Sequence, residues 1–170
     1  MKEILRLHAK YNQSANQAMI DCLKGLSIDD FNKDMGLYFR SICKTFEHAL
    51  AVDSMVFANV YANYSDKKLD TASIAAIVNA DLSIADEVRI SMQTLFEARK
   101  KVDDFIIALI EHINDFSKIE VLEFPGIKFE KPIYQFLISV LTHDTHHRGQ
   151  IAAALDILGI ENDFNGMLGV

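Results

Sequence analysis

Three of the six histidines lie within five residues of one another, in the segment 141–150, which reads LTHDTHHRGQ. His143 and His147 are four residues apart, so on a helix they lie one turn above the other on the same side. Two imidazoles in that position can bind one metal ion, which could lower the pKa of a bound water or stabilise a thiolate. The pair is therefore a candidate half of a metal site.

A helix is predicted to carry this pair. Residues 132–159 have apolar side chains at three- and four-residue spacing, with Pro132 as the first helical residue and Gly159 as the C′ residue. At about 100° per residue, the apolar face includes His147 and borders His143, whereas His146 points away from it. The pair is thus predicted to face the core. Core histidines satisfied by hydrogen bonds are the alternative, but two buried imidazoles without a ligand cost desolvation that a metal would offset.

The residues beside the pair allow two interpretations. Arg148 and Gln150 either contact the substrate or the metal ligands, or they form polar bonds between helices. Gly149 costs about 1 kcal/mol relative to Ala inside a helix, and we expect it to permit a close helix approach. Asp53, elsewhere in the chain, either orients a histidine, caps a helix or faces solvent.

A third ligand must come from another helix. His48 lies at the edge of the apolar face of a second predicted helix. His8 and His112 compete with it as nitrogen donors, and Glu47 and Asp53 could supply oxygen. The periodicity does not choose among these residues.

The elements that must position these residues are helices. The 170 residues contain only two prolines and seven glycines, and long segments show helical apolar spacing. The four long helices are predicted over residues 3–24, 39–61, 82–113 and 132–159. The connections are a short turn starting at Ser27, an ambiguous segment at 71–80 and a loop or small hairpin at 114–131. We predict an all-α four-helix bundle formed by a single domain over residues 1–170.

Composition and charge exclude several classes of function. Seventeen basic and twenty-four acidic residues give a net charge of −7, so a nucleic acid is a poor partner. Cys22 and Cys43 form no C-x-x-C motif, which argues against a disulfide framework and favours a reducing cytoplasm. The charged N-terminus resembles no export signal, and no apolar run is long enough for a membrane span. Neither glycine-rich nucleotide-binding motif is present.

Several segments resemble one known family. The run from His143 through Ile151 resembles the H-x-x-x-H-R-G-Q signature of the DinB/YfiT-like superfamily. Residues 41–53, which include His48, are similar to that family's "SI..TL.H…VD" segment, and residues 11–16 resemble its opening helix. The likeness spans nearly the whole chain. It implies a four-helix bundle, often a homodimer, that binds one divalent metal ion through His48, His143 and His147.

The metal site that the resemblance implies could support catalysis. Three neutral imidazoles leave a coordination position open, as in catalytic zinc sites, and all-nitrogen ligation suits Zn, Ni, Co or Cu. Because relatives include thiol-dependent transferases and isomerases, we expect a metal-dependent hydrolase or thiol transferase acting on a small molecule, with thiols among the candidates. The alternative is a metal-binding or stress-related interaction module without turnover. A cleft over the metal would favour the enzyme, and a sealed metal would favour the module.

Overall fold

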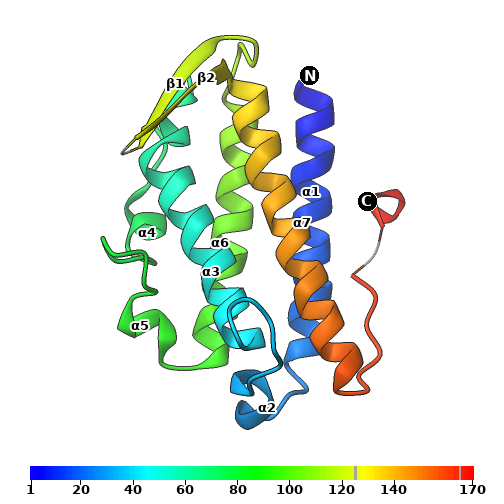
Figure 1. The fold of residues 1–170 in the computed structure, drawn as a ribbon. Helices are drawn as coiled ribbons and strands as arrows, with labels where there is room; N and C mark the ends of the chain where they lie inside the picture. The colour runs from blue at the N-terminus through cyan, green and yellow to red at the C-terminus, as the bar shows by residue number, and fades with distance from the viewer. Residues whose placement is uncertain (125, 165) are drawn as a thin grey trace.

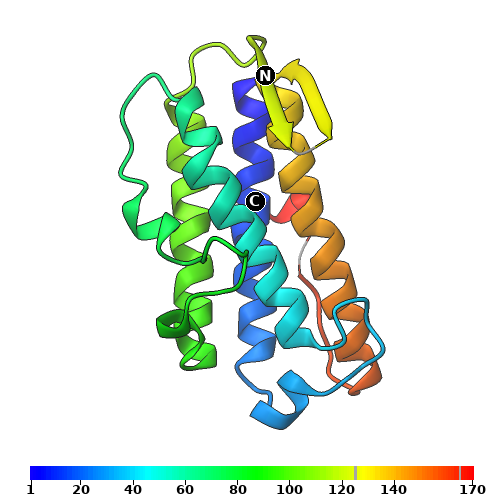
Figure 2. The ribbon, with the colours of Figure 1, turned by 60° about the vertical axis from the view of Figure 1, so that its left-hand side comes forward.

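The computed structural model describes residues 1–124, 126–164 and 166–170, and it is mostly helical. Its long helices run side by side, as Figures 1 and 2 show from two directions. They are α1 (Lys2–Leu23), α3 (Ile42–Asn59), α6 (Met92–Glu111) and α7 (Ile133–Ile157). Helices α1 and α3 each pack against both α6 and α7. No helix in the described part of the chain is long and apolar enough to cross a membrane.

Shorter elements connect the long helices. They are α2 (Ile28–Asn32), the 3-10 helix η1 (Tyr61–Tyr64), α4 (Ala72–Ala75) and α5 (Asp86–Arg89). A further 3-10 helix, η2 (Met167–Gly169), follows α7 near the C-terminus. Strands β1 (Ile119–Phe124) and β2 (Ile127–Pro132) form an antiparallel hairpin in which Ile119 pairs with Pro132 and Phe124 with Ile127. This hairpin lies at the end of the molecule where α1 begins (Figure 1). It confirms the hairpin among the alternatives predicted for residues 114–131.

The helix predicted over residues 82–113 is wrong in its first part. Leu82 adopts a left-handed φ of 65°, and Val78 pairs with Ile84 in an isolated antiparallel bridge. Helix α6 begins only after Ser91, whose hydroxyl accepts the backbone N–H of Thr94 while the Thr94 hydroxyl accepts the N–H of Ser91. This capping box stabilises a helix start at that point, so the apolar spacing before it does not produce a continuous helix.

The ends of the other long helices also have local causes. Ser41 caps α3 by accepting the backbone N–H of Lys44, so this helix starts at residue 42 and not at 39. Gly159 has a φ of 72°, and Ile160 donates its N–H to the carbonyl of Leu155, which completes the predicted C-terminal motif of α7. Helix α7 therefore has nearly the predicted bounds.

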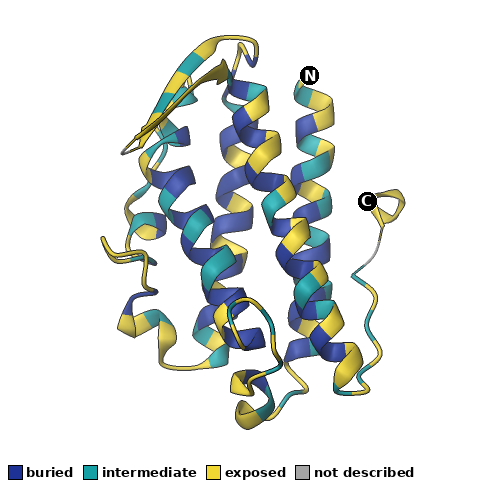
Figure 3. Ribbon diagram, viewed as in Figure 1, coloured by how far each residue is buried: buried dark blue, intermediate teal, exposed yellow. Residues whose placement is uncertain are grey.

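The core lies between the four long helices. Figure 3 shows the buried residues on the helix sides that face one another. Among the largest fully buried side chains are Leu5, Leu23, Phe46, Phe57, Leu109 and Ile110. Burial of such side chains is worth about 1.5–3 kcal/mol each, which makes helix packing the main source of stability. Several charged side chains are also buried at mid-height, and they adjoin the histidines of α3 and α7.

Candidate metal centre

Three histidine side chains from α3 and α7 converge at one point. The Nε2 atom of His143 lies 3.3 Å from Nε2 of His48 and 2.9 Å from Nε2 of His147. Among the described residues, this trio is one of two groups whose donor atoms lie close enough to share a metal ion; the other is Asp53, His143 and Asp144. His8 and His112, the competing nitrogen donors, belong to neither group.

The nitrogen spacing fits a metal ion. Zinc binds imidazole nitrogen at about 2.0–2.1 Å, so two ligands at 90–109° from each other place their nitrogens about 2.9–3.4 Å apart. Both measured separations, 2.9 Å and 3.3 Å, fall in that interval. The donor set of three imidazoles, with no acidic oxygen in this group, fits a divalent transition metal such as zinc or nickel.

The three imidazoles are suited to be neutral ligands. Burial, followed by the proximity of His147 and His143, lowers the pKa of His48 to about 4. Burial also lowers the pKa of His143 and of His147. The rings are therefore uncharged near neutral pH, and a nitrogen lone pair is free to bind a cation.

Gln150 orients one of the rings. Its Oε1 atom lies 2.7 Å from Nδ1 of His147. Because an amide oxygen only accepts, Nδ1 of His147 must donate, which leaves the lone pair on Nε2, the atom that faces His143. Hydrogen bonds of this kind fix the tautomer of metal-binding histidines. Gln150 thus contacts the ring of His147.

Phe39 forms one wall of the histidine cluster. Its ring stacks on His48 at 4.1 Å between centroids and lies 5.7 Å from the ring of His147. The segment between α2 and α3 that carries it turns back through left-handed residues at Gly36 and Arg40. Phe39 was expected only as the first residue of a helix, and no spacing in the sequence indicated its contact with His48.

A hollow opens beside His48. Its volume is about 220 Å³, and it lies between the loop that carries Phe39, the outer side of α3 and the segment before α6. The lining residues are Phe39, Lys44, Glu47, His48, Leu82, Ser83, Ile84 and Arg89. Glu47 accepts hydrogen bonds from both Lys44 and Arg89, at 2.7 Å and 2.8 Å. It does not join the histidine cluster as an oxygen donor.

Comparison with known proteins gives the family. The model described as DinB family matches residues 1–164. This chain belongs to the DinB family. No curated protein matches it, and no solved structure does.

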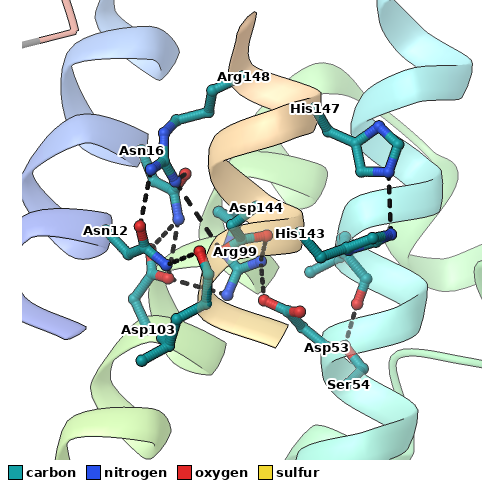
Figure 4. Close-up of polar contacts among 12 residues, drawn as sticks. Asn12, Asn16, Asp53, Ser54, Arg99, Asp103, His143, Asp144, His147 and Arg148 are labelled. Carbon is teal, nitrogen blue, oxygen red and sulfur yellow. Dashed lines mark hydrogen bonds and ion pairs between the residues drawn. The ribbon is translucent and has the colours of Figure 1, made fainter. Parts of the chain in front are cut away.

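Behind the histidines, this DinB-family protein buries a network of charged side chains (Figure 4). Arg99 lies between Asp53, whose Oδ2 accepts from Nη1 at 2.8 Å, and Asp103, whose Oδ1 is 2.8 Å from Nη2. Asp144, next to His143 in the chain, lies 3.7 Å from Nη1 of Arg99. Asp53 is fully buried, so the interpretation that it faces solvent is wrong.

Arg148 joins this network from the side of α1. Its guanidinium donates to Asn12 Oδ1 at 2.7 Å and to Asn16 Oδ1 at 3.0 Å. Asn16 in turn donates to Asp103, and Asn12 donates to the carbonyl of Leu141. Arg148 therefore forms polar bonds between helices, which was one of its two predicted roles, and it is not among the residues that line the hollow beside His48.

Carboxyl groups outnumber guanidinium groups in this network. Asp53, Asp103 and Asp144 face two guanidinium groups, those of Arg99 and Arg148. Burial, followed by the neighbouring Asp144, raises the pKa of Asp53 well above its ordinary value. Burial also raises the pKa of Asp103 to about 7. A cation bound at the neighbouring histidine cluster would favour the ionised form of these carboxyl groups and so lower their pKa values.

Some buried polar atoms of the network have no hydrogen-bond partner in the described residues. Nδ1 of His143, Oδ1 of Asp53 and Nε of Arg99 make no hydrogen bond. Oδ2 of Asp144 and Nη2 of Arg99 make none either, although they form ion pairs with Arg148 and Asp103. Asp53, Asp144 and a ring nitrogen of His143 lie within 4.8 Å of one another. Unsatisfied buried polar groups are rare in native proteins, and they cluster here directly behind a candidate metal ligand.

Two further residues differ from simple expectations. Burial raises the pKa of the Cys43 thiol to about 11, so this side chain is no ready thiolate for ligation or catalysis. A Cβ added at Gly149 would have no heavy atom within 4 Å beyond its own helix and chain neighbours. The predicted close helix approach at Gly149 is therefore wrong, because this residue faces outward from α7.

Proposed function

We propose that this DinB-family protein binds one divalent transition metal ion through His48, His143 and His147 and uses it on a small-molecule substrate. The observation that carries the proposal is the convergence of three neutral imidazole rings. Nε2 of His143 lies 2.9 Å from that of His147 and 3.3 Å from that of His48. When bound, such an ion would supply Lewis-acid chemistry, activating water or holding a thiol as its thiolate.

The buried network of charged side chains supports the proposed metal site, because it can hold a histidine ligand in place. We infer that, in the metal-loaded protein, Nδ1–H of His143 donates to Oδ1 of Asp53 or Oδ2 of Asp144, two oxygens that accept no hydrogen bond from the described residues. Gln150 performs the equivalent task for His147. Hydrogen bonds from metal-binding histidines to carboxylates or carbonyls hold the rings in place, and their loss typically weakens metal binding about 10–100-fold.

A metal-dependent hydrolase or thiol transferase is the activity we favour over a non-catalytic metal-binding or stress-related module. The hollow of about 220 Å³ has His48 in its wall, so it can bring a small molecule next to the histidine cluster. A thiol reaction would use an external thiol, because the pKa of the neighbouring Cys43 is raised to about 11.

We also propose the assembly that the family resemblance implies. The four long helices would form the four-helix bundle of the family as one domain over residues 1–170, and two copies would associate as a homodimer. Light scattering coupled to gel filtration would test the dimer directly, and a single-copy mass at micromolar concentration would contradict it.

Metal analysis of protein purified without an affinity tag tests the proposed site. We expect about one divalent ion per chain in the wild type and almost none in His48→Ala. The helical circular dichroism spectrum of His48→Ala should persist, since helix packing supplies most of the stability. Full metal occupancy in that variant would refute the three-histidine assignment.

A further inference from the structure

The hollow beside His48 carries an excess of positive charge on an acidic protein. Lys44 and Arg89 line it together with one buried carboxylate, Glu47. These side chains sum to about one positive charge, whereas the whole chain carries −7. Asp81 accepts hydrogen bonds from the backbone N–H and hydroxyl of the lining residue Ser83 and keeps its negative charge, but it does not itself line the hollow.

Arg89 has donors left over. Its Nε donates to Glu47 Oε1 at 2.8 Å, and the described residues engage no other atom of its guanidinium. Its side chain is 42% exposed and that of Lys44 is 50% exposed, so both reach solvent at the mouth of the hollow. A guanidinium with a free pair of N–H groups binds a carboxylate or phosphate through two parallel hydrogen bonds.

We propose that Arg89, with Lys44, binds an oxyanionic group of the substrate, a carboxylate or a phosphate, while the reacting end of the substrate lies at the histidine cluster. This inference rests on the proposed function, because it names the class of substrate for that site. Glu47 accepts hydrogen bonds from both cations at the wall that also contains His48, so it is the internal carboxylate with which the substrate anion competes. The substrate class is therefore a small acid rather than a neutral molecule.

The volume of the hollow limits the size of this acid. At about 220 Å³ it is smaller than the roughly 300–1,000 Å³ that enclose drug-sized ligands. Phe39, Leu82 and Ile84 give the walls apolar surface. A short chain of a few carbon atoms between the acid group and the reacting group fits such a space.

The test compares a small acidic thiol with its neutral counterpart. Zinc-loaded protein is titrated calorimetrically with 3-mercaptopropionate and with 3-mercaptopropionamide, which differ in charge but little in size. We expect the acid to bind at least about tenfold more tightly to the wild type, and Arg89→Gln to reduce that preference to under about threefold. Arg6→Gln, which removes an arginine paired with Glu3 and Glu111 at the start of α1, should keep the preference.

Two further variants separate an anion site from a purely structural ion pair. Arg89→Lys keeps the charge and should retain part of the preference for the acid. Glu47→Gln removes the carboxylate that now competes for Lys44 and Arg89, so the acid should bind more tightly to this variant than to wild type. A structural pair would instead give lower thermal stability with no gain in affinity, and that result would overturn the proposal. Equal affinities of acid and amide for the wild type would also overturn it.

Metal-free protein distinguishes this inference from the proposed function. Propionate and inorganic phosphate are titrated into ¹⁵N-labelled metal-free protein, and the signals of Ser83, Ile84 and the Arg89 side chain are followed. Saturable shifts that Arg89→Gln abolishes would support the anion site even if no metal is ever found, and the tighter of the two probes identifies the preferred anion. Metal binding without any such shifts would leave the metal site standing and refute the anion site.

Discussion

At the scale of single residues, the direction of each imidazole decides its role. His147 is buried; its Nδ1 contacts Gln150, and its Nε2 faces Nε2 of His143. His146 is its neighbour in sequence, yet it is exposed and lies outside the histidine cluster. A difference of one position on a helix, about 100°, thus separates a proposed ligand from a surface residue.

This difference can be measured. We expect His147→Ala to lose the metal and His146→Ala to keep about one ion per chain, because only the former removes an inward nitrogen donor. His146→Ala should change the free energy of unfolding by less than about 0.5 kcal/mol, as most exposed sites do. Metal content by mass spectrometry and thermal melts check both variants, and the reverse pattern would show that the inward face of α7 is misassigned.

The pKa values of the three histidines predict weak pH dependence of metal binding. Protons compete with the metal for each ring nitrogen, and three histidines with ordinary pKa values near 6.5 would lose about 50-fold in affinity between about pH 7.5 and about pH 6. Burial lowers all three pKa values, that of His48 to about 4, so protonation sets in only at more acid pH. We expect a loss of under about tenfold in a zinc competition titration. A loss near 50-fold would mean that the rings are solvated.

At the scale of elements, local signals in the sequence predicted α7 best. Gly159 and Pro132 lie at the two ends of this helix, and both are residues with strong backbone preferences. The apolar spacing before α6 misled the prediction, because Ser91 and Thr94 cap the helix from inside the periodic segment. A capping motif can start a helix inside a segment whose apolar residues have helical spacing. The spacing alone therefore does not give the residue at which the helix begins.

The candidate site, like the helices, was predicted only in part from the sequence. The spacing of His143 and His147 predicted the pair, but five residues remained as the third ligand until the family resemblance implied His48. Phe39 and Arg89 were missed because they reach the site from loops and a short helix. Their positions depend on how the chain returns to α3, and no periodic pattern within one element encodes that.

Alanine substitutions at two glycines, Gly149 within α7 and Gly159 just after it, are predicted to change the stability in opposite directions. Gly149 has a free space around its Cβ position, so Gly149→Ala should stabilise the protein by about 0.5–1 kcal/mol through helix propensity. Gly159 has a φ of 72°, so Gly159→Ala should destabilise it by about 1 kcal/mol or more. Urea unfolding curves of both variants check the pair. Equal signs for the two substitutions would contradict this account of α7.

At the scale of the whole molecule, charge limits the choice of partners. With a net charge of −7, the protein should not bind duplex DNA specifically at physiological salt, because the phosphate backbone needs a basic surface. A gel-shift assay at about 0.15 M salt checks this expectation. Retention that depends on the DNA sequence would contradict it.

The hairpin divides the proposed ligands between two parts of the chain. His48 precedes β1, whereas His143 and His147 follow β2, and Lys128 is exposed in the hairpin between them. Tryptic cleavage after Lys128 would therefore leave a fragment with one ligand and a fragment with two, held together by the contacts of α7 with α1 and α3. The metal ion would then link the two fragments through their histidine ligands, and the association of the fragments would strengthen with metal concentration by mass action. In the nicked protein, a chelator should accelerate the exchange of the α7 fragment. The rate of fragment exchange would therefore report on metal occupancy.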